Sequence, residues 1–544
     1  MSIPSSVTSI GESAFSKNTS LRTVTFEEGS KIESIANDAF NDNQALTSIN
    51  VISGSPEYSS IDGILFNKDQ TLLIKYPGGN TNSSYVIPAG VTSIGAKEFS
   101  EATFLTSISI PASVTSIDFR AFNGAKSLTS ISVSNKNHEY SSIEGILFNK
   151  NQTELERYPE GNDNLTYMIP ASVKSISSYA FCNIKSLTAV MFEKGSQLTS
   201  IGDYAFLGTT SLTSIKIPSS VESMGKNAFA FDKSLVIYAE ARHESSGWDY
   251  DWNFNDYPVV WNVKEYGKYN GIHYARLNDD SITIISVDNT IENLVIPKAI
   301  NNYEVKSIYD RAFYNNQELK TVIFEEGSQL VSIGRVAFRC CTNLTSIIIP
   351  STVINIDENA FYGCTSLTSI IIPNSMTIIG ESVFKGCKNL KNITILNNVT
   401  RIGDFAFEGC ISLTSIDIPS SVKIIGKSAF ENCSSLVNIL IPSSITDIGE
   451  SVFKNCNSLT SITISSGVMR IKTSAFEGCS SLTSIELPSG ILVLGGFIFE
   501  NCSSLTSIVY TGTKTMWDSI WKECFWNYTL NSYVIHCTDE DIVK

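Results

Sequence analysis

Cysteine is the residue type whose number and spacing first suggest chemistry in this chain. The sequence contains twelve cysteines, and eight of them recur at intervals of 23 residues. These eight are Cys341, Cys364, Cys387, Cys410, Cys433, Cys456, Cys479 and Cys502. No C-x-x-C pair is present to chelate zinc. The interval instead predicts that one cysteine occupies the same position in each unit of a repeat.

Two states of these cysteines are compatible with a repeat. If the units stack, neighbouring cysteine Cα atoms lie within about 5 Å, a separation that permits a disulfide. Side chains in a stack point the same way, however, and unpaired cysteine is among the most buried residue types. We therefore expect buried free thiols that fill a tight turn, with disulfides as the alternative. Free thiols in such number would suit a reducing or anoxic setting if the protein is exported.

An acidic segment resembles the start of a calcium-binding loop. Asp249, Asp251 and Asn253 alternate along the chain as the first ligands of such a loop do. Phe254 stands where the loop needs glycine, and no glutamate follows at its twelfth position. The sequence therefore favours acidic residues that face water between buried tryptophans, and we expect no metal site.

Signals for catalysis are weak. Histidine is the commonest acid–base group, and the chain has only four, in four different contexts: His138, His243, His273 and His536. No G-x-S-x-G motif is present, and the G-K-S fragment at Gly426–Ser428 lacks the upstream glycine of a phosphate-binding loop. We expect surface histidines, no cofactor and no enzymatic activity.

The composition is that of a folded, acidic protein. The 544 residues are 42% hydrophobic and 17% charged, with a formal net charge of −15. Negative charge opposes binding to DNA, RNA and anionic lipid, so we expect no nucleic-acid partner. No stretch approaches the roughly 18 apolar residues that a membrane span needs, and no signal peptide is visible. Because the chain opens inside a repeat at Ile3 and Pro4, we expect that an export signal and earlier units precede it.

The elements that position these residues are repeats of 23 residues. The recurring phenylalanines of the second half are Phe338, Phe361, Phe384, Phe407, Phe430, Phe453, Phe476 and Phe499. The unit from Leu367 to Cys387 reads LTSIIIPNSMTIIGESVFKGC, in which alternating isoleucines predict a short strand that the proline ends. So small a unit cannot bury its own apolar residues, and successive units must stack their strands in a parallel sheet. The sequence predicts a β-rich solenoid.

The first half follows the same frame with two long interruptions. The insertions, at about 53–84 and 135–166, contain the matching sequences EYSSIDGILFNKDQTLLIKYP and EYSSIEGILFNKNQTELERYP. Apolar runs on both sides of a polar N-K-D/N-Q-T turn predict a hairpin. We expect each hairpin to project from the solenoid edge as a stabilising flap, with a binding loop as the alternative.

The six tryptophans mark the ends of two solenoid blocks. Three lie in Gly247–Trp261 and three in Thr511–Trp526, and none lies inside a repeat. The open end of a solenoid needs a cover, so we interpret both segments as caps. The predicted organisation is a first block at 1–237, a Trp-rich cap or linker at 238–265, an opening hairpin at 266–300, a second block at 301–509 and a C-terminal cap at 510–544.

The pattern SLTSIxIPSSVxxIGxxAFxxC resembles the BspA-like class of leucine-rich repeats over nearly the whole chain. The resemblance implies a curved, leucine-rich-repeat-like solenoid with short parallel strands on its concave face. It also implies a cell-surface or secreted protein that binds a protein or another macromolecule of a host or neighbouring cell. It implies no catalytic activity.

Residues that point outward from the predicted strands are the candidates for partner binding. In SLTSIxIP the leucine and the isoleucines turn inward, so the serine and the variable residue face outward. In the second block the variable positions give Ile323, Ile348, Ile371, Thr394, Asp417 and Leu440 as candidate partner-binding residues. Outward isoleucines on adjacent strands would form an apolar patch, which a soluble protein rarely leaves exposed without purpose. We predict a non-catalytic interaction protein, and a structural stalk or spacer as the alternative.

Overall fold

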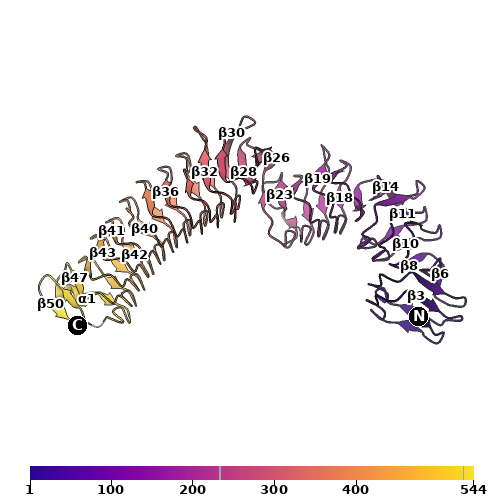
Figure 1. Cartoon of the computed structure of the whole chain (residues 1–544), viewed down its shortest axis with the longest axis horizontal. Helices are drawn as coiled ribbons and strands as arrows, with labels where there is room; N and C mark the ends of the chain where they lie inside the picture. Colours follow the sequence, from indigo (N-terminus) through magenta and orange to yellow (C-terminus); the bar gives the residue numbers. More distant parts are fainter. Residues whose placement is uncertain (232–234, 531) are drawn as a thin grey trace. The chain divides into compact units, whose positions relative to one another are not determined.

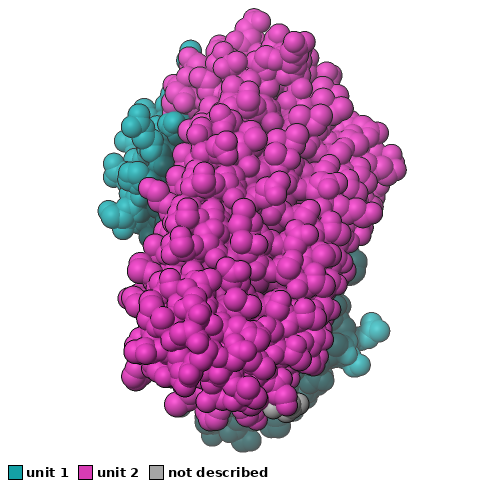
Figure 2. Space-filling model, turned by 90° about the vertical axis from the view of Figure 1, so that its left-hand side faces the viewer, with its two compact units in different colours: residues 1–262 teal, residues 263–544 magenta. Residues whose placement is uncertain are grey.

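The chain forms successive coils of short strands with turns between them. The computed structural model describes residues 1–231, 235–530 and 532–544. They divide into two compact units, Met1–Asn262 and Val263–Lys544, which are coloured separately in Figure 2. A coil contributes one strand to a main sheet and one shorter strand to a second sheet (Figure 1). Within the described residues, the one helix is α1 (Lys514–Ser519). The predicted β-solenoid with coils of about 23 residues is confirmed.

One coil shows how the sequence produces this path. Strand β36 (Ser369–Ile372) alternates exposed and buried residues, and Pro373 ends it because proline cannot donate to the ladder. The chain then forms the second-sheet strand β37 (Ile378–Ile379). Ser382 and Gly386 adopt left-handed backbone conformations, with φ of 53° and 73°, and turn the chain toward the next coil.

Except across the two insertions, the strands of the first unit pair in parallel with their equivalents one coil away. Its main-sheet strands are β1 (Ser2–Ile3), β3 (Thr23–Phe26), β5 (Ser48–Val51), β9 (Ser84–Val86), β11 (Ser107–Ile110), β13 (Ser130–Val133), β17 (Thr166–Ile169), β19 (Ala189–Phe192), β21 (Ser214–Ile217), β23 (Val236–Ala239) and β25 (Val259–Val260). Its second-sheet strands are β2 (Ser9–Ile10), β4 (Ser34–Ile35), β8 (Leu72–Lys75), β10 (Ser93–Ile94), β12 (Ser116–Ile117), β16 (Glu154–Arg157), β18 (Ser175–Ile176), β20 (Ser200–Ile201), β22 (Ser223–Met224) and β24 (Gly247–Trp248).

The second unit opens with an antiparallel hairpin and then repeats more regularly. The hairpin and its partners are β26 (Val263–Tyr269), β27 (Ile272–Leu277), β28 (Ile282–Val287), β30 (Ala299–Ile300) and β31 (Tyr303–Ile308). The main-sheet strands are β29 (Asn293–Ile296), β32 (Thr321–Phe324), β34 (Ser346–Ile347), β36, β38 (Asn392–Ile395), β41 (Asn438–Ile441), β43 (Ser461–Ile464), β45 (Ser484–Leu487), β47 (Ser507–Tyr510), β49 (Val534–His536) and the antiparallel β50 (Asp541–Val543). The second-sheet strands are β33 (Ser332–Ile333), β35 (Asn355–Ile356), β37, β39 (Arg401–Ile402), β40 (Ile424–Ile425), β42 (Asp447–Ile448), β44 (Arg470–Ile471), β46 (Val493–Leu494) and β48 (Trp521–Lys522).

The core consists of identical residues stacked from coil to coil. In the second unit one continuous cluster of buried side chains runs from Ile272 to Ile535. Its recurring phenylalanines stack with ring centroids 4.7 to 5.9 Å apart from Phe313 to Phe499. Each such pair adds about 0.5–1.5 kcal/mol to the burial of the rings. The repeat is therefore stabilised by the contacts between units.

The two insertions do not project from the solenoid, and the expectation of a flap at its edge is wrong. Strands β6 (Tyr58–Ile61), β7 (Ile64–Asn67) and β8 form an antiparallel meander, and β8 continues in parallel with β10. The second insertion does the same with β14 (Tyr140–Ile143), β15 (Ile146–Asn149) and β16. Leu65 packs into one core cluster while its neighbours Ile64 and Phe66 pack into the next. Each insertion is a wall between two stretches of solenoid.

A glycine turn joins each wall to the solenoid. Asp62 and Gly63, between β6 and β7, both have positive φ, as the tightest hairpin turns require. The Gly63 carbonyl accepts a hydrogen bond from the Ile49 N–H on β5, at 2.7 Å. A Cβ atom on Gly63 would lie 2.6 Å from Ser48 Cβ, so only glycine fits. The sequence prediction located the polar turn between β7 and β8 and missed this second turn, whose signal was the D-G pair.

A buried cation secures each wall to the coils on either side. Lys75 Nζ donates to Asn41 Oδ1 at 3.0 Å and to Ser100 Oγ at 3.2 Å. In the second insertion, Arg157 donates to Asn123 Oδ1 at 2.7 Å and to a backbone carbonyl at 2.6 Å. Burial lowers the pKa of Lys75. These bonds offset part of the cost of burying the two cations, although Nε and Nη2 of Arg157 have no hydrogen-bond partner.

The Trp-rich segments continue the sheets as well as cover the cores. In the first segment β24 pairs with β22 and β25 with β23, and Trp248 and Trp252 are buried. In the second, Trp517 is buried but Trp521 is 69% exposed. The opening hairpin begins at Val263, a little before the predicted residue 266.

The eight repeating cysteines lie in the core of the second unit. Each thiol donates a hydrogen bond of 2.9 to 3.3 Å to the carbonyl of the phenylalanine in the preceding coil. In the first unit Asn43 stands at the equivalent position and donates to the Phe15 carbonyl at 2.7 Å. Burial raises the pKa of the Cys387 and Cys433 thiols to about 12. The thiols are thus protonated donors at neutral pH, and reactivity requires the thiolate.

We expect thiol reagents to distinguish these cysteines from the others. Near neutral pH, native protein should react at the exposed Cys524 and more slowly at the partly exposed Cys340 and Cys537, while the eight repeating thiols and the buried Cys182 remain unmodified. Denaturation without reductant should make all twelve cysteines titratable. Peptide mapping of the labelled protein checks both results, and native labelling of Cys387 or a denatured count far below twelve would contradict them.

Candidate functional site

The six residues predicted to face outward on the main sheet of the second unit are all exposed. The aliphatic ones, Ile323, Ile348, Ile371 and Leu440, are 50%, 73%, 62% and 55% exposed, and Thr394 and Asp417 are exposed too. The residues that alternate with them along each strand are buried or half-buried. Side-chain alternation therefore places Ile323, Ile371, Thr394 and Leu440 on the outer face of the main sheet. Ile348, just after β34, and Asp417, in a coil without an assigned main-sheet strand, stand at the equivalent position of the repeat.

The structure brings only some of these residues together. Val295 on β29 is 58% exposed and lies in register with Ile323 on β32. Ile348 and Ile371 follow at the same position in the next two coils. We call Val295, Ile323, Ile348 and Ile371 the apolar row. Thr394, in register with Ile371, ends it, and Asp417 separates it from Leu440.

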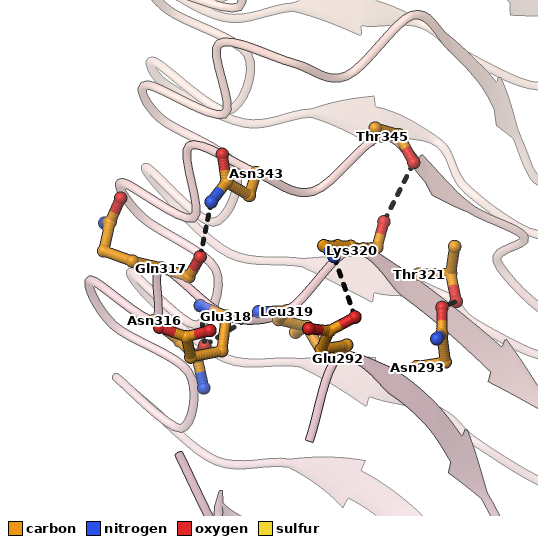
Figure 3. A network of polar contacts seen from close by, with 10 residues as sticks. All are labelled: Glu292, Asn293, Asn316, Gln317, Glu318, Leu319, Lys320, Thr321, Asn343 and Thr345. Atoms are coloured by element: carbon orange, nitrogen blue, oxygen red, sulfur yellow. Dashed lines mark hydrogen bonds and ion pairs between the residues drawn. The ribbon is translucent and has the colours of Figure 1, made fainter. Parts of the chain in front are cut away.

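A network of polar contacts fixes the strands beside the apolar row (Figure 3). Lys320 Nζ forms an ion pair with Glu292 at 2.8 Å, and Thr321 Oγ1 donates to Asn293 Oδ1 at 2.7 Å. Both contacts join the coil of β29 to that of β32. Side chains that are already bonded to one another hold the apolar row on a preformed surface.

Threonine hydroxyls perform a structural role on the same face. Thr345 Oγ1 donates to the Lys320 carbonyl at 3.0 Å, and Thr368 Oγ1 donates to the Thr345 carbonyl at 3.4 Å. Each bond joins one coil to the coil before it, and Figure 3 shows the bond of Thr345. The recurring threonines are thus used by the solenoid itself, which leaves the variable positions as the ones free to contact a partner.

A cavity of about 590 Å³ opens at the end of the apolar row. Val295 lines it together with Ile272, Ile291 and Leu294. Its polar lining residues include Asn270, Asn293, Lys298 and Glu325. This volume lies within the range of about 300–1,000 Å³ that ligand pockets occupy, and the lining is apolar with a few polar groups, as such pockets require.

Sequence reasoning missed Val295 and the cavity for different reasons. The motif LVIP at Leu294–Pro297 restarts the repeat and places Val295 at the variable position, so the repeat frame could have identified it. The cavity depends on how the turn between β26 and β27 lies against β29. Nothing in the spacing of residues along the chain reports that contact.

A second hollow, of about 530 Å³, lies on the first unit and is lined by the carboxylates of Asp118, Glu154, Glu156 and Asp203. Ser177 Oγ lies 2.7 Å from Glu154 Oε1 and 3.0 Å from Glu156 Oε2. Because one hydroxyl proton cannot be directed fully at two carboxylates, this arrangement favours protonation of one of the two carboxyl groups. Burial, followed by the charge of Glu154, raises the pKa of Glu156 to about 7.

The remaining sequence candidates have local structural roles. Asp249 Oδ1 accepts the Asp251 N–H at 2.8 Å, and Asn253 Oδ1 accepts the Tyr257 N–H at 3.0 Å, so both side chains close turns. The four histidines are exposed or half-exposed. Over the described residues, no group of three histidine, cysteine, aspartate or glutamate side chains has the arrangement of a metal site. In the same part of the chain, none of the helices has the length and hydrophobicity of a membrane span.

Comparison with known proteins identifies the repeat. The family model "BspA type Leucine rich repeat region" matches residues 1–83, 79–168, 160–239, 287–411 and 425–543. A leucine-rich repeat protein from Bacteroides ovatus is 24% identical and aligns over 84% of this chain and 98% of its own, with a TM-score of 0.40. A leucine rich cell surface protein from Faecalibacterium prausnitzii is 22% identical over 86% of this chain and 99% of its own, with a TM-score of 0.26. No curated protein sequence matches this chain.

The shared proton at Glu156 predicts a pH dependence of stability. Its pKa is about 7 in the folded chain and near 4.5 when unfolded, so the folded state binds the extra proton between these values. Stability should therefore fall as the pH rises from about 4.5 to about 7, and this contribution should change little above pH 7. Glu156→Gln should remove this fall in stability with rising pH, whereas Glu486→Gln, at an exposed position of β45, should retain it.

Thermal unfolding of the full chain across this pH range checks the prediction. The informative quantity is the difference in midpoint between wild type and Glu156→Gln, because titrating groups that do not interact with Glu156 contribute equally to both. A difference that does not vary with pH would show that Glu156 holds no proton near neutrality.

Proposed function

Because this chain belongs to the BspA-type leucine-rich repeat family, we propose that it is a non-catalytic protein-binding solenoid that contacts its partner through the main sheet of its second unit. The apolar row carries this proposal. Four aliphatic side chains, each at least half exposed, lie on adjacent coils, and soluble proteins rarely expose such a patch unless it binds something.

The surface is suited to binding without rearrangement. The ion pair between Lys320 and Glu292 and the threonine-to-carbonyl bonds hold its strands before any partner arrives. A preformed surface loses little conformational entropy on association, so modest contacts spread over several coils add up to useful affinity. The partner in this proposal is a protein or another macromolecule on a host or neighbouring cell, and the chain acts at the cell surface or after secretion.

A structural stalk is the second candidate function. The bonds of Thr345 and Thr368 to carbonyls of the preceding coil favour it, because they show polar residues on the main sheet serving the solenoid. A stalk needs regular stacking but no exposed apolar row. The two functions therefore differ in what replacement of that row should do.

The decisive experiment is the capture of surface proteins by the immobilised full chain. Purified host surface and extracellular-matrix proteins are passed over wild type and over Ile323→Ser/Ile348→Ser/Ile371→Ser, and affinities are measured by biolayer interferometry. We expect the triple variant to weaken binding at least about tenfold, since truncation of central interface residues costs more than about 1 kcal/mol each. Folding should persist because all three side chains are exposed.

A matched control comes from the second sheet. Ile378 in β37 and Ile424 in β40 are both 50% exposed, and Ile354, directly before β35, is 58% exposed. Their replacement by serine removes the same apolar atoms from residues outside the main sheet. This control variant should bind like wild type. Equal binding by wild type, the triple variant and the control variant would contradict the proposal, and the absence of any captured protein would favour the stalk.

A further inference from the structure

We propose that the cavity beside Val295 receives an aromatic side chain from a basic, apolar segment of the protein partner. This inference rests on the proposed function and specifies which chemistry the main sheet recognises. It goes beyond the apolar row because the cavity is a concave site with its own lining, formed by the turn of the opening hairpin and by the first main-sheet strand of the second unit.

Local backbone geometry shapes the wall of the cavity. Gly271, in the turn between β26 and β27, has a φ of 81°. A Cβ atom there would lie 2.6 Å from Ile291 Cδ1, so glycine allows the turn to approach Ile291. The neighbouring Tyr269 and Asn270 then form one side of the cavity, while Val295 and Pro297 form another.

The lining favours an aromatic occupant. The partly exposed Ile291 and Pro297 and the exposed Val295 provide an apolar lining, and Asn270 adds a side-chain amide to it. Tryptophan and tyrosine combine a large apolar ring with one polar edge, and they are the residues most often found as anchors in interface pockets. A cavity of about 590 Å³ has room for such a ring.

Continuity with the apolar row shows that the occupant is part of a longer segment. Val295 both lines the cavity and begins the row, and its register partner Ile323 continues the row on the next strand. Successive coils of a solenoid lie about 4.8 Å apart, so the row extends some 14 Å from Val295 to Ile371. A polypeptide with one aromatic residue followed by aliphatic ones covers both features.

The charges around the cavity favour a basic segment. Glu325 lines the cavity and Glu326 follows it in the exposed turn. Glu292 is paired with Lys320, and the Glu325 carboxylate accepts the Lys298 N–H at 2.8 Å. Lys298 is thus one cation beside two carboxylates, of which Glu325 lines the cavity and Glu326 lies next to it in the sequence. The net charge of −15 on the whole chain acts in the same direction. Lysine or arginine beside the aromatic anchor would therefore gain electrostatic attraction.

The test uses synthetic peptides and the full chain. The probe is a short fluorescent peptide that alternates leucine and lysine and carries one tryptophan, and its two counterparts replace the tryptophan by alanine or the lysines by glutamate. We expect wild type to bind the tryptophan peptide about tenfold more tightly than the alanine peptide, which corresponds to about 1.4 kcal/mol. The glutamate peptide should bind more weakly than the lysine peptide.

Two protein variants locate the effect. Ala299 lines the cavity, so Ala299→Phe should fill it and abolish the preference for tryptophan, whereas Ser351→Phe, at an exposed position after β34, should preserve that preference. Glu325→Gln/Glu326→Gln should reduce the preference for lysine, and Glu358→Gln/Glu381→Gln, at exposed positions elsewhere on the unit, should not. If Ala299→Phe does not fold, Val295→Ser replaces it, and the same loss of preference is expected.

The outcomes separate this inference from the proposed function. Equal binding of the tryptophan and alanine peptides to wild type, or a preference that survives Ala299→Phe, overturns the inference. If the inference fails but Ile323→Ser/Ile348→Ser/Ile371→Ser still binds the captured proteins more weakly than wild type, the proposed function stands without the inference. Binding of wild type to phosphatidylcholine vesicles that Ala299→Phe removes would identify lipid as the occupant and would also overturn it.

Discussion

The structure depends on one constraint, which is that each coil acquires its core only by lying in register on its neighbours. The stacked rings from Phe313 to Phe499 and the thiol-to-carbonyl bonds of the repeating cysteines are all contacts between coils. Repeat proteins gain their stability from such nearest-neighbour interfaces, because a unit of this size cannot bury its own apolar residues. The register between neighbouring coils is therefore strongly constrained, since a slip of one residue would turn the buried isoleucines of β36 toward water.

The same constraint gives the outer face its potential for recognition. A residue at one outward position lies beside its equivalent in the next coil, so similar residues at that position in a few successive coils form a continuous patch. The apolar row is such a patch, and Thr394 shows how one polar residue ends it. The inward residues remain apolar across these coils, so the surface can vary while the core is preserved.

Most of the fold could be predicted from the sequence because the spacing of the repeated residues indicates directly how the coils stack. The alternation in SLTSIxIP predicted which side chains of β36 and β41 point inward, and the 23-residue interval predicted their parallel pairing. The insertions were misjudged because their apolar runs predict strands without saying what covers each face, and both faces of β7 turned out to be buried. Trp521 was assigned to the cap by composition, yet its register partner on the second sheet is Val493, which leaves it exposed. The cavity beside Val295 was beyond prediction because it arises from a contact between a turn and a distant strand.

The walls in the first unit explain why the candidate site lies in the second. Each wall divides the buried side chains of the first unit into separate clusters, and the main-sheet strands β5 and β9, like β13 and β17, belong to different sheets on its two sides. A ladder of outward residues cannot continue across a wall, so the main face of the first unit falls into three stretches, of three, three and five paired strands. In the second unit one core cluster runs from Ile272 to Ile535, so the outward positions follow one another from coil to coil without a wall. An extended binding surface needs that continuity, and the apolar row begins at the first main-sheet strand where the chain provides it.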